Sequence, residues 1–228
     1  MLKAVIMDFD GVIVDTEVVW FNIFHAWFKE KWNYDLTIEE FLVCVGSHPE
    51  ELFNKLEKEY NIIIDRNQFV EETNHKFLDE SKDLPLKEGV LEFLQSIKNE
   101  NISLAIATSA SRKKPMYHLT RLEILDYFDE IITSEDVEKI KPNPDLFNKA
   151  IEKLGITKEK AIIIEDSVNG LIAGNRADIQ TIVCTNDVTK HSTFEKYFMK
   201  VDSLKEIDLE HIIKKFDESS DRYAIRCN

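Results

Sequence analysis

Glycine, proline, cysteine and positive charge are all scarce in this chain of 228 residues. With 6 Gly, 5 Pro and no low-complexity tract, the chain has no segment typical of a flexible linker between independent domains. Any second domain is therefore expected to be inserted through short hinges. No apolar run approaches the roughly 18 residues that a membrane-spanning helix requires, so we expect no membrane partner.

Positive charge is outnumbered, because 29 Lys and Arg stand against 43 Asp and Glu, and the formal net charge is −14. A nucleic acid is not expected as a partner, since binding its phosphate backbone requires Lys and Arg. The same net charge repels a phosphate ester. A site for such a substrate would therefore need a local cation.

The three cysteines, Cys44, Cys184 and Cys227, lie far apart and form no metal-binding spacing. We interpret them as reduced structural thiols, with Cys227 on a loose tail. The N-terminal apolar run is too short for the core of a signal peptide. These features predict a cytoplasmic protein, and the oligomeric state is left open between a monomer and a weak dimer.

Short apolar runs alternate with stretches of helical periodicity. The runs are typical of strands that are buried on both faces, and they occupy residues 4–7, 102–107, 131–132, 161–164 and 179–183. Between them, apolar residues recur at helical spacing over 90–97 and 146–154. This alternation predicts an α/β fold with an open, mostly parallel sheet.

One long segment interrupts that alternation with helix-like patterns and little strand signal, over residues 18–28, 38–45, 50–60 and 69–78. We predict a helical cap domain at 16–84, inserted into a core formed by 1–15 and 85–228. Thr16 is a candidate N-cap of its first helix. Residues 204–216 are expected to form a closing helix, followed by about ten loose residues.

Acidic residues follow two of the predicted strands. Asp8 and Asp10 come directly after the first strand, and Glu165 and Asp166 follow the run that begins at 161. Ligands of open α/β sheets bind at the carboxyl ends of the strands, so these four carboxylates should share one crevice. Four ionised carboxylates need compensation, and Mg²⁺ with oxygen ligands would provide it beside a phosphate.

These acids belong to an ordered series of motifs that resembles the haloacid dehalogenase superfamily, and within it the phosphatases and phosphomutases related to β-phosphoglucomutase. The resemblance covers residues 1 to about 185 and rests on Asp8-Phe9-Asp10-Gly11, Thr108-Ser109, Lys141-Pro142 and Glu165-Asp166. It implies a Rossmann-like core with a helical cap after the first motif, in agreement with the periodicity.

The resemblance also implies roles for single residues. Asp8 would attack phosphorus to form an aspartyl-phosphate, and Asp10 would act as general acid and then as general base. Ser109 and Lys141 would bind the phosphoryl oxygens. Mg²⁺ would be held by the Asp8 side chain, the Asp10 backbone carbonyl and Asp166, with Glu165 nearby or bound through water.

Three positions depart from the β-phosphoglucomutase pattern. Trp20 stands where those enzymes carry a histidine, Val45 replaces a lysine before the cap-loop Gly46, and Pro49 replaces an arginine. A mutase needs such cationic groups to hold a second phosphate. The sequence therefore favours an Mg-dependent phosphatase for a small phosphate monoester, such as a sugar phosphate, over the alternative, a phosphosugar mutase.

Other readings are disfavoured by particular residues. In a receiver-like signalling domain, the phosphorylated aspartate is itself the signal. Such a domain would lack an acid at the position of Asp10, because an acid/base there makes the acyl phosphate short-lived. A catalytically silent scaffold would not carry the complete set of motif residues, and the dehalogenase branch does not use the metal-binding acids. Substrate contacts are predicted at Thr108, Ala110, Trp20 and Gly46.

Overall fold

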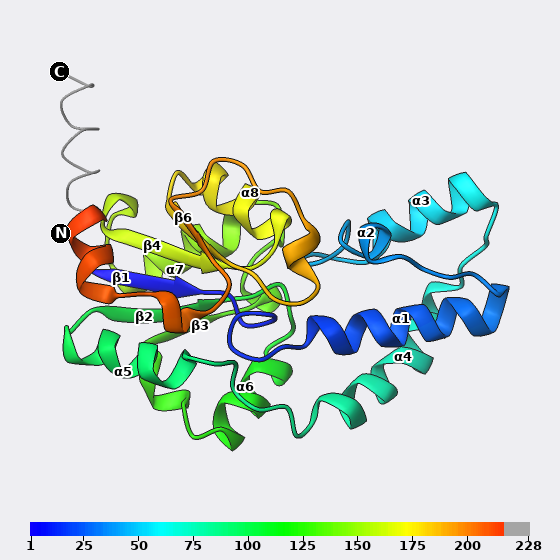
Figure 1. The fold of residues 1–228 in the computed structure, drawn as a ribbon, viewed down its shortest axis with the longest axis horizontal. Coiled ribbons are helices and arrows are strands. Elements are labelled where there is room, and N and C mark those ends of the chain that lie inside the picture. The colour runs from blue at the N-terminus through cyan, green and yellow to red at the C-terminus, as the bar shows by residue number, and fades with distance from the viewer. Residues whose placement is uncertain (217–228) are drawn as a thin grey trace.

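The computed structural model describes residues 1–216, and its core is one sheet of six parallel strands in the order β3-β2-β1-β4-β5-β6 (Figure 1). The strands are β1 (Ala4–Met7), β2 (Ser103–Ala107), β3 (Glu130–Ile132), β4 (Ala161–Glu165), β5 (Gln180–Cys184) and β6 (Met199–Val201). The predicted α/β fold with its parallel sheet is confirmed. The strand β6 was not predicted, because three residues with a lysine at the centre give no apolar run.

Helices cover both faces of this sheet. The helices α5 (Val90–Asn99) and α6 (Lys113–Arg121) lie against one face, and α7 (Asp145–Leu154) and α8 (Val168–Ala177) against the other (Figure 1). Successive β1 residues enter opposite cores, Val5 with α5 and Ile6 with α7. Burial on both faces explains why β1 is a continuous apolar run.

The cap is a separate helical lobe inserted between β1 and α5 (Figure 1). Its helices are α1 (Glu17–Trp32), α2 (Ile38–Phe41), α3 (Glu50–Tyr60) and α4 (Arg66–Ser81). They surround an apolar core of their own that is rich in aromatic residues, where Trp27 and Phe69 have ring centroids 4.9 Å apart. The predicted helical cap is confirmed.

Two local expectations for the cap were wrong. The helix predicted over 38–45 ends at Phe41, because the chain then turns toward Gly46, whose φ of 75° does not fit a right-handed helix. Thr16 precedes α1, but its hydroxyl caps no backbone N–H. It donates instead to the Asp10 carboxylate, so Thr16 belongs to the site.

Short connections join core and cap. Val14 and Leu86 form an antiparallel bridge, and the Lys87 N–H donates to the Ile13 carbonyl at 3.0 Å. The two passages of the chain therefore support each other where the cap begins and ends. The boundaries at 15/16 and 84/85 stay a prediction.

The last described residues complete the apolar core between the sheet and α5. Residues 204–206 form a 3-10 turn and 209–216 are helical, so the expected closing helix is interrupted. Leu209, Ile212 and Phe216 pack on the α5 face of the sheet.

Cys227 and the tail predicted to be loose lie outside the described residues, whereas Cys44 and Cys184 are buried free thiols. Among the described helices, none is long and apolar enough to cross a membrane.

Candidate active site

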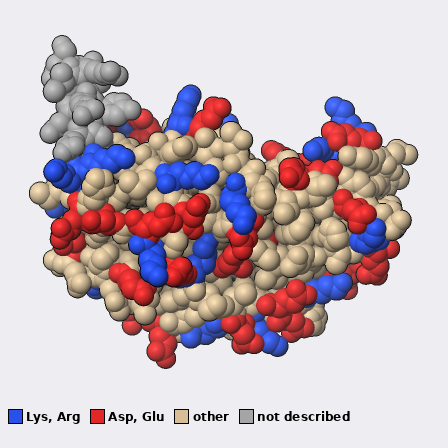
Figure 2. Space-filling view, viewed as in Figure 1, with Lys and Arg blue, Asp and Glu red and all other residues tan. Residues whose placement is uncertain are grey.

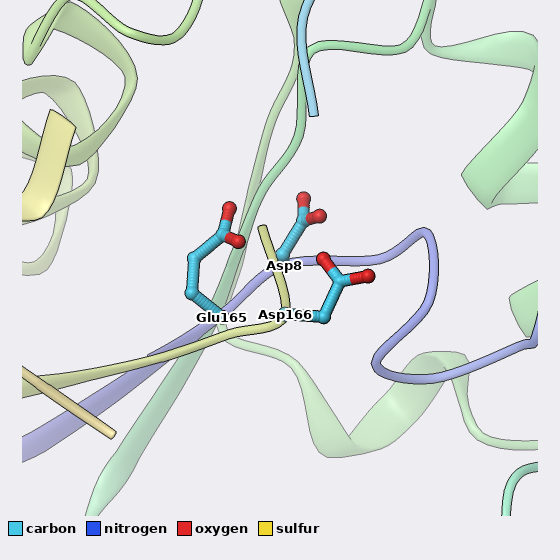
Figure 3. A group of neighbouring side chains, drawn as sticks. All are labelled: Asp8, Glu165 and Asp166. Carbon is cyan, nitrogen blue, oxygen red and sulfur yellow. The ribbon is translucent and has the colours of Figure 1, made fainter. Parts of the chain in front are cut away.

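Asp8 stands at the carboxyl end of β1, in the middle of the sheet. Its N–H donates to the Ile164 carbonyl at 2.9 Å, which extends the parallel pairing of β1 with β4 by one residue. The same pairing brings Glu165 and Asp166 beside it. Figure 3 shows the three carboxyl groups extending from two neighbouring strand ends toward a common space, and one oxygen of each lies within 4.8 Å of the others.

Burial makes this arrangement electrostatically unfavourable on its own. It raises the pKa of Asp8 to about 7, against the opposing charge of Lys141. Burial, followed by the charge of Glu165, raises the pKa of Asp166 well above its ordinary value. Ionised carboxylates here need a positive partner, and oxygen donors at this spacing suit a hard divalent cation.

Lys141 supplies one positive charge from the loop that precedes α7. Its buried Nζ lies 2.7 Å from Asp8 Oδ1 and 2.7 Å from Glu165 Oε1. Burial alone would lower the pKa of this amine, but the two carboxylates raise it above its ordinary value. Lys141 is therefore a fixed cation at the predicted nucleophile.

Protein donors hold both oxygens of Glu165. Lys141 binds Oε1, and the N–H and hydroxyl of Ser167 donate to Oε2 at 2.8 and 2.9 Å. Gly170 lies so close that an added Cβ would be 1.8 Å from this carboxyl group. The geometry suits a residue that orients Lys141, and the predicted contact of Glu165 with a metal stays a prediction.

Asp166 has a partner that was not identified from the sequence. The Asn186 amide donates to Asp166 Oδ2 at 2.6 Å, and Asn186 lies in the loop after β5. The backbone of Gly11, at a φ of 70°, passes close to this pair, and an added Cβ would be 2.1 Å from the same oxygen. Asn186 carries no motif signal, because only the neighbouring position of β4 and β5 brings it here.

Asp10 lies nearer to the cap than Asp8 does. Its Oδ1 accepts hydrogen bonds from the Thr16 hydroxyl and from Lys114 Nζ, the latter at 2.6 Å. Lys114 was not identified from the sequence either, because it is one of several cations at the start of α6. The fold places it opposite Asp10, from a different strand–helix unit.

Ser109 joins the core to the cap. It follows β2 after Thr108, and its hydroxyl donates to the Gly46 carbonyl in the cap loop at 2.9 Å. The same loop is bound to the core by Asn169, whose amide donates to the Val45 carbonyl at 2.9 Å. These contacts position the cap loop over the strand ends.

A cavity of about 810 Å³ lies between core and cap. It is lined by most of the predicted catalytic and substrate-binding residues: Asp8, Asp10, Ser109, Thr108, Ala110, Trp20 and Gly46. Lys141, Glu165 and Asp166 surround Asp8 without lining this space. The fold thus brings the predicted residues together, and their roles stay proposals.

Glu17 also lines the cavity and was not predicted. It is buried at the start of α1, and burial, followed by the charge of Asp10, raises its pKa to about 8. The sequence offered one indication that Glu17 belongs to the site, namely its place directly after Asp15 and Thr16. An acid at a helix start is common, however, and its burial follows only from the packing of cap on core.

Comparison with known proteins agrees with this geometry. The family model for haloacid dehalogenase-like hydrolases matches residues 5–184. YhcW of Bacillus subtilis (strain 168), provisionally named a phosphatase, is 30% identical over 212 residues, covering 92% of this chain and 95% of that protein. A phosphorylated carbohydrates phosphatase of Thermotoga maritima is also 30% identical, covering 79% and 84%.

The fold is shared with solved structures as well. The β-phosphoglucomutase of Clostridium difficile superposes with a TM-score of 0.80 at 23% identity, covering 96% of this chain and 99% of that one. The chain belongs to the haloacid dehalogenase-like hydrolases, and the resemblance predicted from its motifs is confirmed. Both curated relatives described above are named phosphatases.

Proposed function

We propose that this chain is an Mg-dependent phosphatase that hydrolyses a small phosphate monoester through an aspartyl-phosphate at Asp8. One observation carries the proposal: Asp8 is a buried carboxylate paired with Lys141 that opens into a cavity between core and cap. A nucleophile at such a place can reach a substrate while bulk water is excluded.

The donor set fits a magnesium ion. Asp8, Asp166 and the Asp10 backbone carbonyl would hold it, with Glu165 alongside. The raised pKa values of Asp8 and Asp166 support this fit, since a cation would stabilise the ionised carboxylates that burial disfavours. When bound, the ion supplies positive charge to the phosphoryl oxygens.

In the first step, an Asp8 oxygen attacks phosphorus while the bond from phosphorus to the leaving oxygen breaks. Asp10 gives its proton to that oxygen, so the product leaves as an alcohol. Lys141 and Ser109 stabilise the charge on the phosphoryl oxygens. The cavity position of Asp10 supports its role, because the leaving group would occupy the space beside it.

In the second step, water attacks the phosphorus of the aspartyl-phosphate. Asp10 takes a proton from that water, the bond between phosphorus and the Asp8 oxygen breaks, and inorganic phosphate leaves. The product is phosphate plus the original carboxylate, so the cycle closes with no net change in the protein. Two easier displacements replace one difficult hydrolysis.

Hydrolysis is favoured over mutase chemistry by the cap. Trp20 lines the cavity where β-phosphoglucomutases carry a histidine, and neither Val45 nor Pro49 offers a cation for a second phosphate.

A small phosphorylated metabolite is the proposed partner. The prediction that nucleic acid is not a partner rests on the formal net charge of −14, and Figure 2 shows Lys and Arg interspersed with Asp and Glu on the face drawn. Cytoplasmic location and a monomeric or weakly dimeric state stay predictions.

The test is phosphate release from a panel of phosphate monoesters and pyrophosphate, with Mg²⁺ or EDTA. We expect Mg²⁺-dependent release by the wild type and a loss of at least about 10³-fold in Asp8→Asn. Asp79→Asn, an exposed change on α4, is the matched control and should keep full activity. Equal activity of Asp8→Asn and wild type would refute the proposal.

A further inference from the structure

The cavity has two unlike walls. The core wall carries Asp8, Asp10, Lys113 and Lys114 with several hydroxyls, whereas the cap wall is formed by α1, α4 and the loop at 44–49 and has Glu17 as its acid. Trp20 and Phe24 come from α1. Residues of α4 at four-residue spacing continue the cap wall, with an inner row of Phe69, Thr73, Phe77 and Ser81 and an outer row of Val70, Asn74 and Leu78, and Lys82 follows directly after the helix.

The inner part of the cap wall combines aromatic rings with the two hydroxyl side chains Thr73 and Ser81. The rings of Trp20 and Phe77 are stacked, with centroids 4.0 Å apart and 7° between their planes. The Thr73 hydroxyl donates to the Phe69 carbonyl of its own helix at 2.7 Å, so it is already bonded within α4. A substrate hydroxyl that faced the rings of Trp20 and Phe77 would lose water and gain little hydrogen bonding.

The mouth of the cavity combines apolar side chains with polar ones such as Asn74 and Lys82. Val70, Leu78 and Tyr117 line it and are 49%, 57% and 50% exposed. Within the described residues, Val70 and Leu78 lie outside the cap's own apolar core, so packing of the cap does not account for them. Apolar side chains left in water around a cavity are typical of a ligand-binding surface.

We propose that the leaving group of the substrate is apolar, so that the enzyme prefers the phosphate monoester of an aliphatic or aromatic alcohol to a sugar phosphate. This inference rests on the proposed phosphatase function. The phosphoryl group binds at Asp8 on the core wall, and the alcohol portion lies against Trp20, Phe77 and Leu78. The volume of about 810 Å³ accommodates such a group beyond the phosphoryl site.

A matched pair of substrates tests this preference. Hexyl phosphate and sorbitol 6-phosphate both carry a primary phosphate on six carbons and differ in hydroxyl groups. In sorbitol 6-phosphate, the hydroxyl next to the carbon that carries the phosphate lowers the pKa of the leaving alcohol. Sorbitol is therefore the better leaving group, and intrinsic reactivity opposes the expected result. We expect kcat/KM for hexyl phosphate to be at least about tenfold higher.

The outcomes separate the inference from the proposed function. Equal or faster hydrolysis of sorbitol 6-phosphate, lost in Asp8→Asn, would overturn the apolar preference and leave the phosphatase proposal intact. Hydrolysis of neither compound, nor of any ester in the wider panel, would overturn both.

Exposed positions on α4 offer variants that should fold. Leu78→Asn should lower the hexyl-to-sorbitol ratio of kcat/KM about three- to tenfold, and Asn74→Leu should raise it by a similar factor. Both changes should act mainly on KM, because a contact far from phosphorus is the same in ground and transition states. Ile63→Asn, at an 84% exposed residue that does not line the cavity, is the control and should stay within about twofold. An unchanged ratio in both α4 variants would overturn the inference.

Discussion

The core wall and the cap wall of the cavity are held in place by different forces. On the core wall, buried charges are fixed by paired partners, such as Lys141 between Asp8 and Glu165. On the cap wall, Trp20 and Phe77 meet through ring stacking, and Leu78 remains half exposed. An unpaired buried charge is costly, whereas an exposed apolar side chain is readily replaced. The proposed chemistry is therefore constrained by the fold itself, and the proposed substrate preference is open to change at low cost in stability.

The largest effect is expected from removing the central cation. Lys141→Met leaves two buried carboxylates without their shared partner, so the free energy of unfolding should fall by about 3–5 kcal/mol. Denaturant unfolding measures it, and phosphate release should be lost as well. Lys153→Met, at an exposed position of α7, is the control. A loss below about 1 kcal/mol would show that the core wall tolerates unpaired charge as easily as the cap wall tolerates substitution.

Glu17, which lies where the two walls meet, should destabilise the protein at alkaline pH. Its pKa in the folded protein, about 8, is above the ordinary 4.5, so the folded state binds its proton more tightly. The stability from this group is complete below pH 4.5 and is lost as pH rises through 8. Glu17→Gln should therefore raise the free energy of unfolding by about 4 kcal/mol at pH 8 and leave it unchanged near pH 4.

Denaturant unfolding at the two pH values measures this difference. Glu71→Gln, on the exposed side of α4, is the matched control and should change stability at neither pH. A Glu17→Gln effect of equal size at both pH values would mean that the group is not buried as an acid.

Magnesium should stabilise the core wall in a pH-dependent way. The pKa of Asp8 is raised to about 7 and that of Asp166 is raised as well, so protons compete with the metal for these ligands. At pH 8, Mg²⁺ at 100 times its Kd should add about 2.7 kcal/mol to the free energy of unfolding. At pH 5 the same concentration should add much less. Thermal unfolding with Mg²⁺ or EDTA measures this, and Asp166→Asn should remove most of the effect.

The smallest effect is expected where the two walls are joined. Asn169→Ala removes the donors to the Val43 and Val45 carbonyls, at a cost of about 1 kcal/mol. Hydrogen exchange should become faster in the cap loop at 43–47, while the strands of the sheet keep their protection. Asn148→Ala, on the exposed side of α7, should change neither. The same loop is also held by the Ser109 hydroxyl, which donates to the Gly46 carbonyl, and by the Ser47 hydroxyl, which donates to the Lys141 carbonyl. Unaltered exchange in the loop would mean that these two bonds suffice to hold it.

Features that depend on local pattern were predictable. Strands β1 to β5 appear at the five predicted apolar runs, and Asp8 lies at the end of the first. The strand β6 was missed because its own sequence contains no apolar run, and it is held in the sheet by its pairing with β5. Thr16 was assigned as a cap because its position before a helix is a local signal, whereas its bond to Asp10 is not.

The sequence by itself determined the α/β order, the inserted helical segment and the acids and lysine of the motifs. Apolar periodicity and the residues at strand ends depend only on neighbouring positions in the chain. Only the tertiary structure decided which other side chains contact these motif residues. Lys114 meets Asp10 and Asn186 meets Asp166 because separate strands place them at one edge of the sheet. Glu17 becomes a buried acid, and the apolar face of α4 becomes a cavity wall, because cap and core close on each other.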